Sequence, residues 1–369
     1  MKIYHVKSSG NELFTVLLSV NAGWSHEPLG KEGISHFLEH AIFLGNEKYP
    51  DPDIHTARFG VTLNGETMAD RTIFFFNSLV EDAQDILEVL LSLVFQPSFD
   101  EEKVLEEKKS KIIPAIVKES DYYPWELAYE WARNLIFEWD FRKSMGTEDS
   151  LKGMDVEDLE EWHKKYYHTL NSILLLSEFM EVEDIAPVEG GTPERHRIKY
   201  EEKEMVLEKN IGNVEIVYAF PFKSYDIRAY ILSTILGNYP ISLFWRAFHR
   251  DAYMVESRVE WHEWGGLFLY IGANTKEHGR IRRKFESFID SLRISSEDLN
   301  RAKKIMTLEV IEKEKSPHSL KHLLSIDPLL KFKGFRGILE RINEVEISDL
   351  RDYANEVLDL VSLREVVVK

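Results

Sequence analysis

One short stretch of the sequence combines two histidines and a glutamate at a spacing suited to metal chemistry. His36 and His40 are four residues apart, with Glu39 between them. On an α-helix this spacing puts both imidazoles on one face, one turn apart, where they can share a metal ion. The Glu39 carboxylate can lie beside the ion without binding it and act as general base on a metal-bound water. The alternative is an amphipathic helix that carries two histidines by chance.

The residues around this trio resemble a known family. The string H-x-x-E-H is the inverted zinc-peptidase motif. Residues 33–40, followed by Phe43-Leu44-Gly45, resemble the pitrilysin-like (M16) metallopeptidases almost residue for residue. The resemblance implies a zinc-dependent endopeptidase with one zinc ion per chain, in which His36 and His40 bind the metal and Glu39 is the catalytic base.

A second segment resembles the family's peptide-binding strand. Residues 59–67 and the following Asp70-Arg71-Thr72 look like the family segment G-x-x-N-A-x-T-x-x-x-x-T, with Gly65 in place of the usual Ala. In the family this segment is an edge strand, and an exposed edge binds an extended peptide through its backbone. The resemblance implies Asn64, Gly65 and Phe43 as substrate-binding residues. An ordinary strand and turn would explain the Asn-Gly pair equally well.

The third zinc ligand is where the sequence departs from the family, which supplies a Glu on a later helix. Alignment from the left puts Pro114 at that place, and alignment from the right puts Ile116 there. Neither can bind zinc. Glu119 is the nearest carboxylate, 79 residues after the second His, and it becomes the expected ligand if the proline shifts the helical register. Glu106, Glu107 and the absence of a third ligand are the alternatives.

A pair of residues in the second half resembles the family's substrate contacts near the scissile bond. Arg246 and Tyr253 have the seven-residue spacing of an Arg and a Tyr in that segment. An Arg can bind a substrate carbonyl or carboxylate, and a phenol can donate to a developing oxyanion. The resemblance implies both as catalytic residues, and the alternative is a surface Arg with a half-buried Tyr.

The elements that must position these residues recur along the chain in the same order. In the first half, the hydrophobic pattern predicts a strand over 13–20, a helix from 33, a strand over 72–76 and a helix over 82–95. In the second half, it predicts a strand over 214–219, a helix over 228–236, a strand over 267–271 and a helix over 281–292. The repeated order indicates a duplication.

Two local matches support the duplication. Residues 102–108 match 297–303 at an offset of 195, and residues 158–162 match 349–353 at an offset of 191. The latter two segments each lead into an apolar closing strand, over 173–176 and 366–368. Nearly equal offsets are what a duplicated domain gives.

The predicted fold class is therefore α+β, with two homologous α/β-sandwich domains resembling M16 peptidases. Each is expected to hold a mostly antiparallel sheet with helices packed on it. The densest Pro/Gly cluster, over 187–194, indicates the boundary. We expect an N-terminal domain over 1–186 with the zinc motif, a linker over 187–197, and a C-terminal domain over 198–369 without a metal motif. One large domain with accidental similarity is the alternative.

Composition excludes several classes of protein. The 369 residues contain no cysteine, which excludes disulfides, thiolate nucleophiles and cysteine-bound metals, so that a metal must be held by His, Asp or Glu. No apolar run is long enough to span a bilayer, and the N-terminus lacks the pattern of a secretory signal, which predicts a cytoplasmic protein without a membrane partner. The net charge of −18 opposes nucleic-acid binding.

The resemblance also implies a partner. Full enzymes of the family carry four such domains in two bowl-like halves that close around a peptide, so that a two-domain chain is expected to pair. A homodimer is one expectation, and a heterodimer with a related M16-like subunit is the other. The implied substrates are peptides or small unfolded proteins, and an acidic chamber would favour basic ones. An alternative function is a catalytically inactive subunit that binds peptides or assembles with an active partner. A third possibility is a metal-free structural protein.

Overall fold

The computed structural model describes residues 1–6, 13–119, 124–137, 145–182, 190–194, 203–209, 214–223, 225–237, 239–252, 254–262, 265–275 and 277–369, with backbone alone for 117–119, 262 and 265–275. These residues form two compact units. Unit 1 consists of Met1–Asp121, Arg142–Glu194 and Lys313–Ile326. Unit 2 consists of Tyr122–Phe141, Arg195–Glu312 and Asp327–Lys369.

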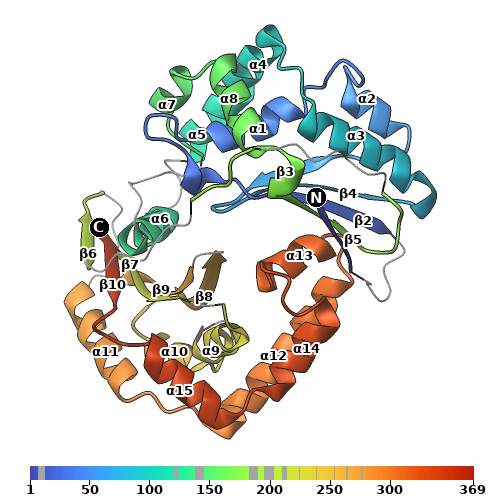
Figure 1. Ribbon diagram of the computed structural model, residues 1–369. Helices are drawn as coiled ribbons and strands as arrows, with labels where there is room; N and C mark the ends of the chain where they lie inside the picture. Colours follow the sequence, from blue (N-terminus) through green and yellow to red (C-terminus); the bar gives the residue numbers. More distant parts are fainter. Residues whose placement is uncertain are drawn as a thin grey trace. The chain divides into compact units, whose positions relative to one another are not determined.

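Each unit is built on a sheet with five described strands (Figure 1). In unit 1 the order is β1-β5-β2-β4-β3, where β1 and β5 are parallel and the other neighbours antiparallel. These strands are β1 (Lys2–His5), β2 (Phe14–Val20), β3 (Asn64–Thr67), β4 (Thr72–Ser78) and β5 (Ser172–Leu176). Within the described chain, β3 is therefore an edge strand.

The sheet of unit 2 has the same arrangement. Its order is β6-β10-β7-β9-β8, again with the first pair parallel and the others antiparallel. The strands are β6 (Glu204–Leu207), β7 (Val214–Phe222), β8 (Met254–His262), β9 (Gly265–Thr275) and β10 (Arg364–Val368). Strand for strand, both order and direction repeat, and the predicted α+β class with mostly antiparallel sheets is confirmed.

The helices repeat as well. Those of the first half are α1 (Ile34–Ile42), α2 (Pro52–Ala57), α3 (Ala83–Phe95), α4 (Glu101–Glu107), α5 (Ile113–Glu119), α6 (Pro124–Ile136), α7 (Glu148–Lys152) and α8 (Val156–Tyr166). Those of the second half are α9 (Ile227–Gly237), α10 (Leu243–Phe248), α11 (His278–Asp290), α12 (Ser296–Glu314), α13 (Ser319–Ile326), α14 (Phe335–Glu344) and α15 (Ile347–Val357). The starts of α3 and α11, and of α4 and α12, are each 195 residues apart, while those of α8 and α15 are 191 apart. Both offsets agree with the sequence matches.

Four short segments complete the description. They are the 3-10 turns η1 (Trp24–His26), η2 (Val80–Asp82) and η4 (Thr169–Asn171), and the π-helical turn η3 (Lys108–Ile112). Among the described residues, no helix combines the length and the apolar character needed to cross a membrane.

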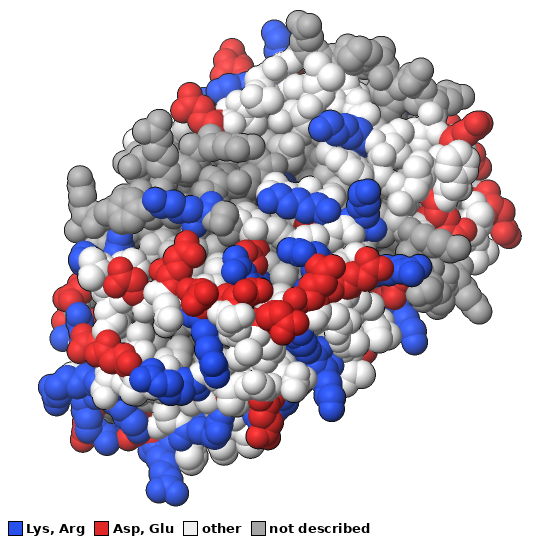
Figure 2. Space-filling view, turned by 60° about the horizontal axis from the view of Figure 1, so that its bottom comes forward, with Lys and Arg blue, Asp and Glu red and all other residues white. Residues whose placement is uncertain are grey.

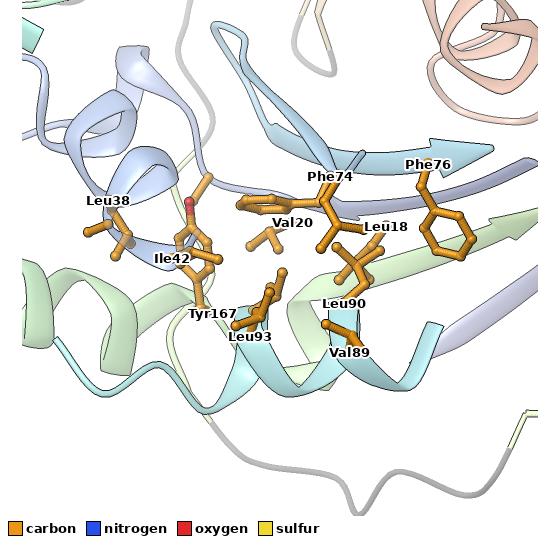
Figure 3. Close-up of a cluster of buried hydrophobic side chains, with 14 of the residues drawn as sticks. Leu18, Val20, Leu38, Ile42, Phe74, Phe76, Val89, Leu90, Leu93 and Tyr167 are labelled. Atoms are coloured by element: carbon orange, nitrogen blue, oxygen red, sulfur yellow. The ribbon is translucent and has the colours of Figure 1, made fainter. Parts of the chain in front are cut away.

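The core of unit 1 lies between its sheet and the helices α1 and α3. In Figure 3, side chains of both helices point toward those of β2 and β4, and Tyr167 completes the cluster. The labelled residues are Leu18, Val20, Leu38, Ile42, Phe74, Phe76, Val89, Leu90, Leu93 and Tyr167. Burying a Leu, Val or Phe side chain contributes about 1.5–3 kcal/mol each, so that this cluster fixes α1 on the sheet.

Each unit also takes one helix from the other half of the sequence. In unit 1, α13 packs on β2 and lies on the side of the sheet away from α1 and α3 (Figure 1). All seven residues of β2 are consequently buried. In unit 2, α6 packs on β10 and β7, where Tyr129 and Arg133 both donate hydrogen bonds to the Glu260 carboxylate.

The exchange makes the units discontinuous in sequence. The predicted linker over 187–197 contains the change of unit between Glu194 and Arg195, but only its residues 190–194 are described. A division into two contiguous domains would assign α6 to the first unit and α13 to the second, whereas each packs in the other unit. The amphipathic pattern of a helix indicates which face is buried, but it does not indicate which sheet covers that face.

On the surface, acidic side chains lie close to basic ones. In unit 2, Arg282 of α11 pairs with Glu204, Glu286 and Glu365. Figure 2 shows a row of Asp and Glu side chains across the middle of one face, with Lys and Arg side chains on both sides of it. Opposite charges in alternation limit the self-repulsion of a chain with net charge −18.

Candidate functional site

The start of α1 is fixed by a buried carboxylate. Glu27 is 1% exposed, and its two oxygens accept hydrogen bonds from the backbone N–H groups of Gly33 (2.6 Å) and Ser35 (2.8 Å). N–H groups at a helix start lack partners within the helix, and negative charge is favourable there. Gly33 has φ 93°, and a Cβ on it would lie 2.5 Å from the Met145 carbonyl oxygen. The helix that carries the histidines therefore begins at a fixed place.

Replacing Glu27 by Gln should destabilise the protein by about 1–3 kcal/mol, because one neutral oxygen replaces two charged acceptors at buried N–H groups. The measurement is the free energy of unfolding in urea. Glu32→Gln is the matched control, since Glu32 accepts one exposed bond from the Gly30 N–H, and its cost should stay within about 0.5 kcal/mol. Equal losses in the two variants would contradict the anchoring role.

His36 and His40 lie side by side on α1. Their ring centroids are 4.8 Å apart with the planes at 90°. Nδ1 of His40 lies 2.9 Å from Oε1 of Glu107 on α4, which packs against α1. Burial raises the pKa of Glu107, but hydrogen bonds from Lys111 and His40 outweigh it and hold that pKa below its ordinary value. The carboxylate accepts the Nδ1–H, so the tautomer of His40 that can bind a metal ion has its lone pair on Nε2.

His36 has a buried ring nitrogen without a partner. Among the described residues, nothing hydrogen-bonds its Nδ1. Burial, with the charge of His40, lowers the pKa of His36 to about 4. The ring is therefore neutral at pH 7, which is the state that binds a metal ion. A buried ring nitrogen without a partner among the described residues is compatible with a bound group outside the protein chain.

Glu39 is buried between α1 and β3. Glu39 is 8% exposed, and its Oε2 accepts a hydrogen bond of 2.6 Å from the Thr67 hydroxyl. Burial raises the pKa of Glu39, although the Thr67 hydrogen bond and the charge of His40 oppose the rise. A raised pKa makes a carboxyl group a stronger proton acceptor than an ordinary Glu, which suits a general base.

The residues of β3 alternate between the two faces of the sheet. The Cβ position of Gly65 and the Thr67 hydroxyl both point to Glu39 on α1. Asn64 and Glu66 consequently point to the opposite face, because successive side chains of a strand point to opposite sides. Asn64 is exposed, and its amide donates to the Thr62 carbonyl oxygen at 3.1 Å.

At Gly65, α1 and β3 approach too closely for a side chain. A Cβ there would lie 2.7 Å from Oε1 of Glu39 and 2.9 Å from Cε2 of Phe43. The Phe43 ring in turn packs edge-on against Phe74, with centroids 5.8 Å apart. Two of the predicted substrate-binding residues, Gly65 and Phe43, thus touch the space around Glu39, and the usual Ala of the family segment would not fit here without a shift.

Gly65→Ala should therefore displace Glu39 and cost about 1–3 kcal/mol of stability through overpacking, measured as the free energy of unfolding. Gly153→Ala is the matched control, because Gly153 has φ −80° and a Cβ on it would come no closer than 3.6 Å to another atom. A Gly65→Ala protein as stable as the wild type would show that the Glu39 and Phe43 side chains can move aside without a loss of stability.

A third metal ligand is absent from the described side chains, where no group of three His, Asp or Glu residues is arranged to hold a metal ion. Glu107 is bonded to His40 and Lys111, each at 2.9 Å, and so orients one imidazole from behind. Glu106 is exposed. The side chain of Glu119 lies outside the described residues, and twelve residues of helix separate it from Glu107 by roughly 18 Å along the axis.

The helix is distorted where the family's ligand is expected. α4 passes into α5 through the π turn Lys108–Ile112, and Pro114 follows directly. A π turn holds an extra residue, so the residues after it face a different direction than an unbroken α-helix would give them. Pro114 is exposed and Ile116 is 7% exposed. The distortion expected at the proline is present, while the assignment of Glu119 as a ligand stays a prediction.

The predicted pair of the second half belongs to unit 2. Arg246 on α10 is half-exposed, and its Nη2 lies 3.2 Å from Oδ1 of Asp298. Burial raises the pKa of Asp298, but hydrogen bonds from Ser295 and the charges of Arg246 and Arg301 bring it below its ordinary value. Tyr253 lies outside the described residues. The catalytic roles of both residues stay predictions.

Sequence reasoning missed the residues that support the site. It considered Glu107 as a ligand, whereas the structure makes it the partner of His40. Thr67 was part of the quoted segment, but its bond to Glu39 depends on how closely β3 approaches α1. Glu27 has no signal in the sequence, because a lone Glu in a polar stretch is ordinarily solvated.

Fold and site together define a class: a duplicated α+β protein whose first unit presents two histidines and a buried glutamate next to an edge strand. The family model described as Insulinase (Peptidase family M16) matches residues 3–128. The uncharacterized zinc protease YmxG of Bacillus subtilis is 20% identical over 381 residues, covering 92% of this chain and 88% of YmxG. The family model and this relative support membership of peptidase family M16.

Solved structures agree on the fold. A protease from Helicobacter pylori superposes with a TM-score of 0.82 at 17% identity, covering 100% of this chain and 96% of that one. A peptidase M16 inactive domain from Pseudomonas fluorescens gives 0.79 at 14% identity, covering 99% and 94%. These likenesses show an M16-like fold. The chain covers 36% or less of the next three curated relatives.

Proposed function

We propose that this protein binds extended peptides along β3 and hydrolyses them as a zinc-dependent endopeptidase. The observation that carries the proposal is the contact of buried Glu39 with Gly65 and Thr67 of the edge strand, one residue from His40. A peptide that adds to β3 would lie beside this carboxyl group. The relative YmxG is described as a zinc protease, which supports the same activity.

The two imidazoles suit a zinc ion. His36 is neutral with an unpartnered Nδ1, and the Glu107 bond directs the lone pair of His40 to Nε2. When bound, zinc would polarise the peptide carbonyl and lower the pKa of a water. The resemblance implies Glu119 as the third ligand, but about 18 Å of helix separates it from Glu107, the partner of His40. We therefore propose a site held by His36 and His40 whose third ligand is not among the described side chains.

The protein's own groups would handle the proton. Glu39 would take it from the attacking water and pass it to the leaving amine, which its raised pKa favours. Thr67 holds the carboxylate and Glu107 holds His40 in orientation. We further propose that the chain pairs as a homodimer, or with a related M16-like subunit, and that Arg246 and Tyr253 contact the substrate in that assembly.

A second function is favoured by one observation. Alignment with the family puts Pro114 or Ile116 at the ligand position, and neither can bind zinc. Pro114 is exposed and follows a π turn. A site with two protein ligands would bind zinc weakly, and its water would be poorly activated. The protein would then be a peptide-binding subunit without hydrolytic activity of its own.

Glu39→Gln should separate the two functions. If the chain is a peptidase, the wild type binds about one zinc per chain and cleaves an unstructured peptide, and the variant keeps its zinc but loses about 100- to 10,000-fold in rate. The measurements are metal content and peptide cleavage by mass spectrometry, with Glu32→Gln as control. Peptide binding without zinc or cleavage would favour the binding subunit, and the absence of all three would contradict both.

Glu107→Gln tests the orientation of His40. Loss of the charged acceptor should weaken zinc binding by about 10- to 100-fold, measured by competition with a chromophoric chelator. Glu106→Gln, on the same helix but exposed, should leave the affinity unchanged. Glu119→Gln should weaken binding if Glu119 is the third ligand, and an unchanged affinity in that variant would remove it from the site.

A further inference from the structure

Glu66 lies on β3 next to the residues that contact Glu39, but on the other face of the sheet. Gly65 and Thr67 point to α1, so Glu66 between them points away from it. On that face its carboxylate forms an ion pair with the Lys321 ammonium group of α13. Both side chains are more than a third exposed, at 39% and 35%.

The ammonium group approaches Glu66 from the inner part of the sheet. α13 packs on β2, and the nearby His318 ring lies edge-on to Phe75 of β4, with centroids 5.8 Å apart. The strand order is β2, β4, β3 and then the free edge. Because Glu66 is on the outermost described strand, its carboxylate lies close to the edge to which a further strand would add.

We infer that Glu66 selects a basic side chain in the bound peptide, in competition with the Lys321 ammonium group. The inference rests on the proposed binding of peptides along β3. Residues opposite one another on paired strands have Cβ atoms about 5 Å apart, where opposite charges attract and like charges repel. A carboxylate has about four lone-pair positions, so that Glu66 can accept a second cation while Lys321 occupies one of them.

The selected position is set by the pleat of the strand. Every second side chain of an added peptide points to the face of Glu66, and the others point to the face of Glu39. The peptide side chain that pairs with Glu66 is therefore different from the peptide side chains that pack beside the histidines. Lys321, the competing partner of Glu66, comes from the second half of the sequence.

The test measures peptide affinity without cleavage. Metal-free protein in EDTA is titrated into a fluorescein-labelled host peptide of Ala, Thr and Gln that carries one central Lys, Gln or Glu, and the dissociation constant is read from anisotropy. The wild type should bind the Lys peptide about two- to fivefold more tightly than the Gln peptide, and the Glu peptide most weakly. Raising the NaCl concentration should reduce these ratios because the charges are partly exposed.

Variants assign the preference to Glu66. In Glu66→Gln the three peptides should bind with equal affinity, and in Glu66→Lys the order should reverse. Lys321→Met should keep the Lys preference or enlarge it, because the competing ammonium group is gone. The matched control is Glu148→Gln, which breaks an exposed Glu148–Lys152 pair on α7 in the same unit and should retain the wild-type order.

The outcomes separate this inference from the proposed function. Equal affinities for all three peptides in the wild type, or an unchanged order in Glu66→Gln, would overturn the role of Glu66 while leaving peptide binding intact. If no peptide binds, β3 is not the binding strand, and both proposals fail. Should Glu66→Gln unfold, as judged by circular dichroism, a loss of the Lys preference in the folded Lys321→Met protein would overturn the inference.

Discussion

The close approach of α1 to β3 is the constraint on which the site depends. A Cβ at position 65 would lie 2.7 Å from Glu39, so the strand and the helix touch through a carboxyl group and a glycine. This contact buries Glu39, raises its pKa and brings the Thr67 hydroxyl to it. Because β3 is the outermost described strand of the sheet, the same contact places the Glu39 carboxyl group beside a strand edge.

The approach is held from three sides. The apolar side of α1 packs with α3, β2 and β4 in the core, and Glu27 fixes the start of the helix. On the other side, Glu107 of α4 holds the His40 ring. These groups fix the helix that carries both imidazoles and orient the His40 ring. What the described residues lack is a third ligand, and the distortion between α4 and α5 lies where the family places one.

Much of the fold and the centre of the site could be predicted from the sequence. The strand over 13–20 and the helix over 82–95 have strong periodicity, and both are present as β2 and α3. The His36, Glu39 and His40 helix could be predicted because its chemistry is contained within one turn. Residues whose role arises from contacts distant in sequence could not, since Glu27, Thr67 and Glu107 gain their partners only when separate elements pack together.

The exchanged helices show why a duplicated sequence need not give two independent domains. α6 and α13 occupy corresponding places in the repeat, and each packs on the sheet of the unit that the other half builds. A first unit without α13 would expose the second face of β2, all of whose residues are buried. The exposure would cost roughly 25 cal/mol for each Å² of apolar surface.

The second half of the chain is therefore needed to complete the sheet that carries the edge strand, and its contribution reaches that strand directly through the Lys321–Glu66 pair. The helix from the second half therefore covers the face of the sheet opposite to the histidines. Charged residues on that face can change without altering the histidine helix on the other face.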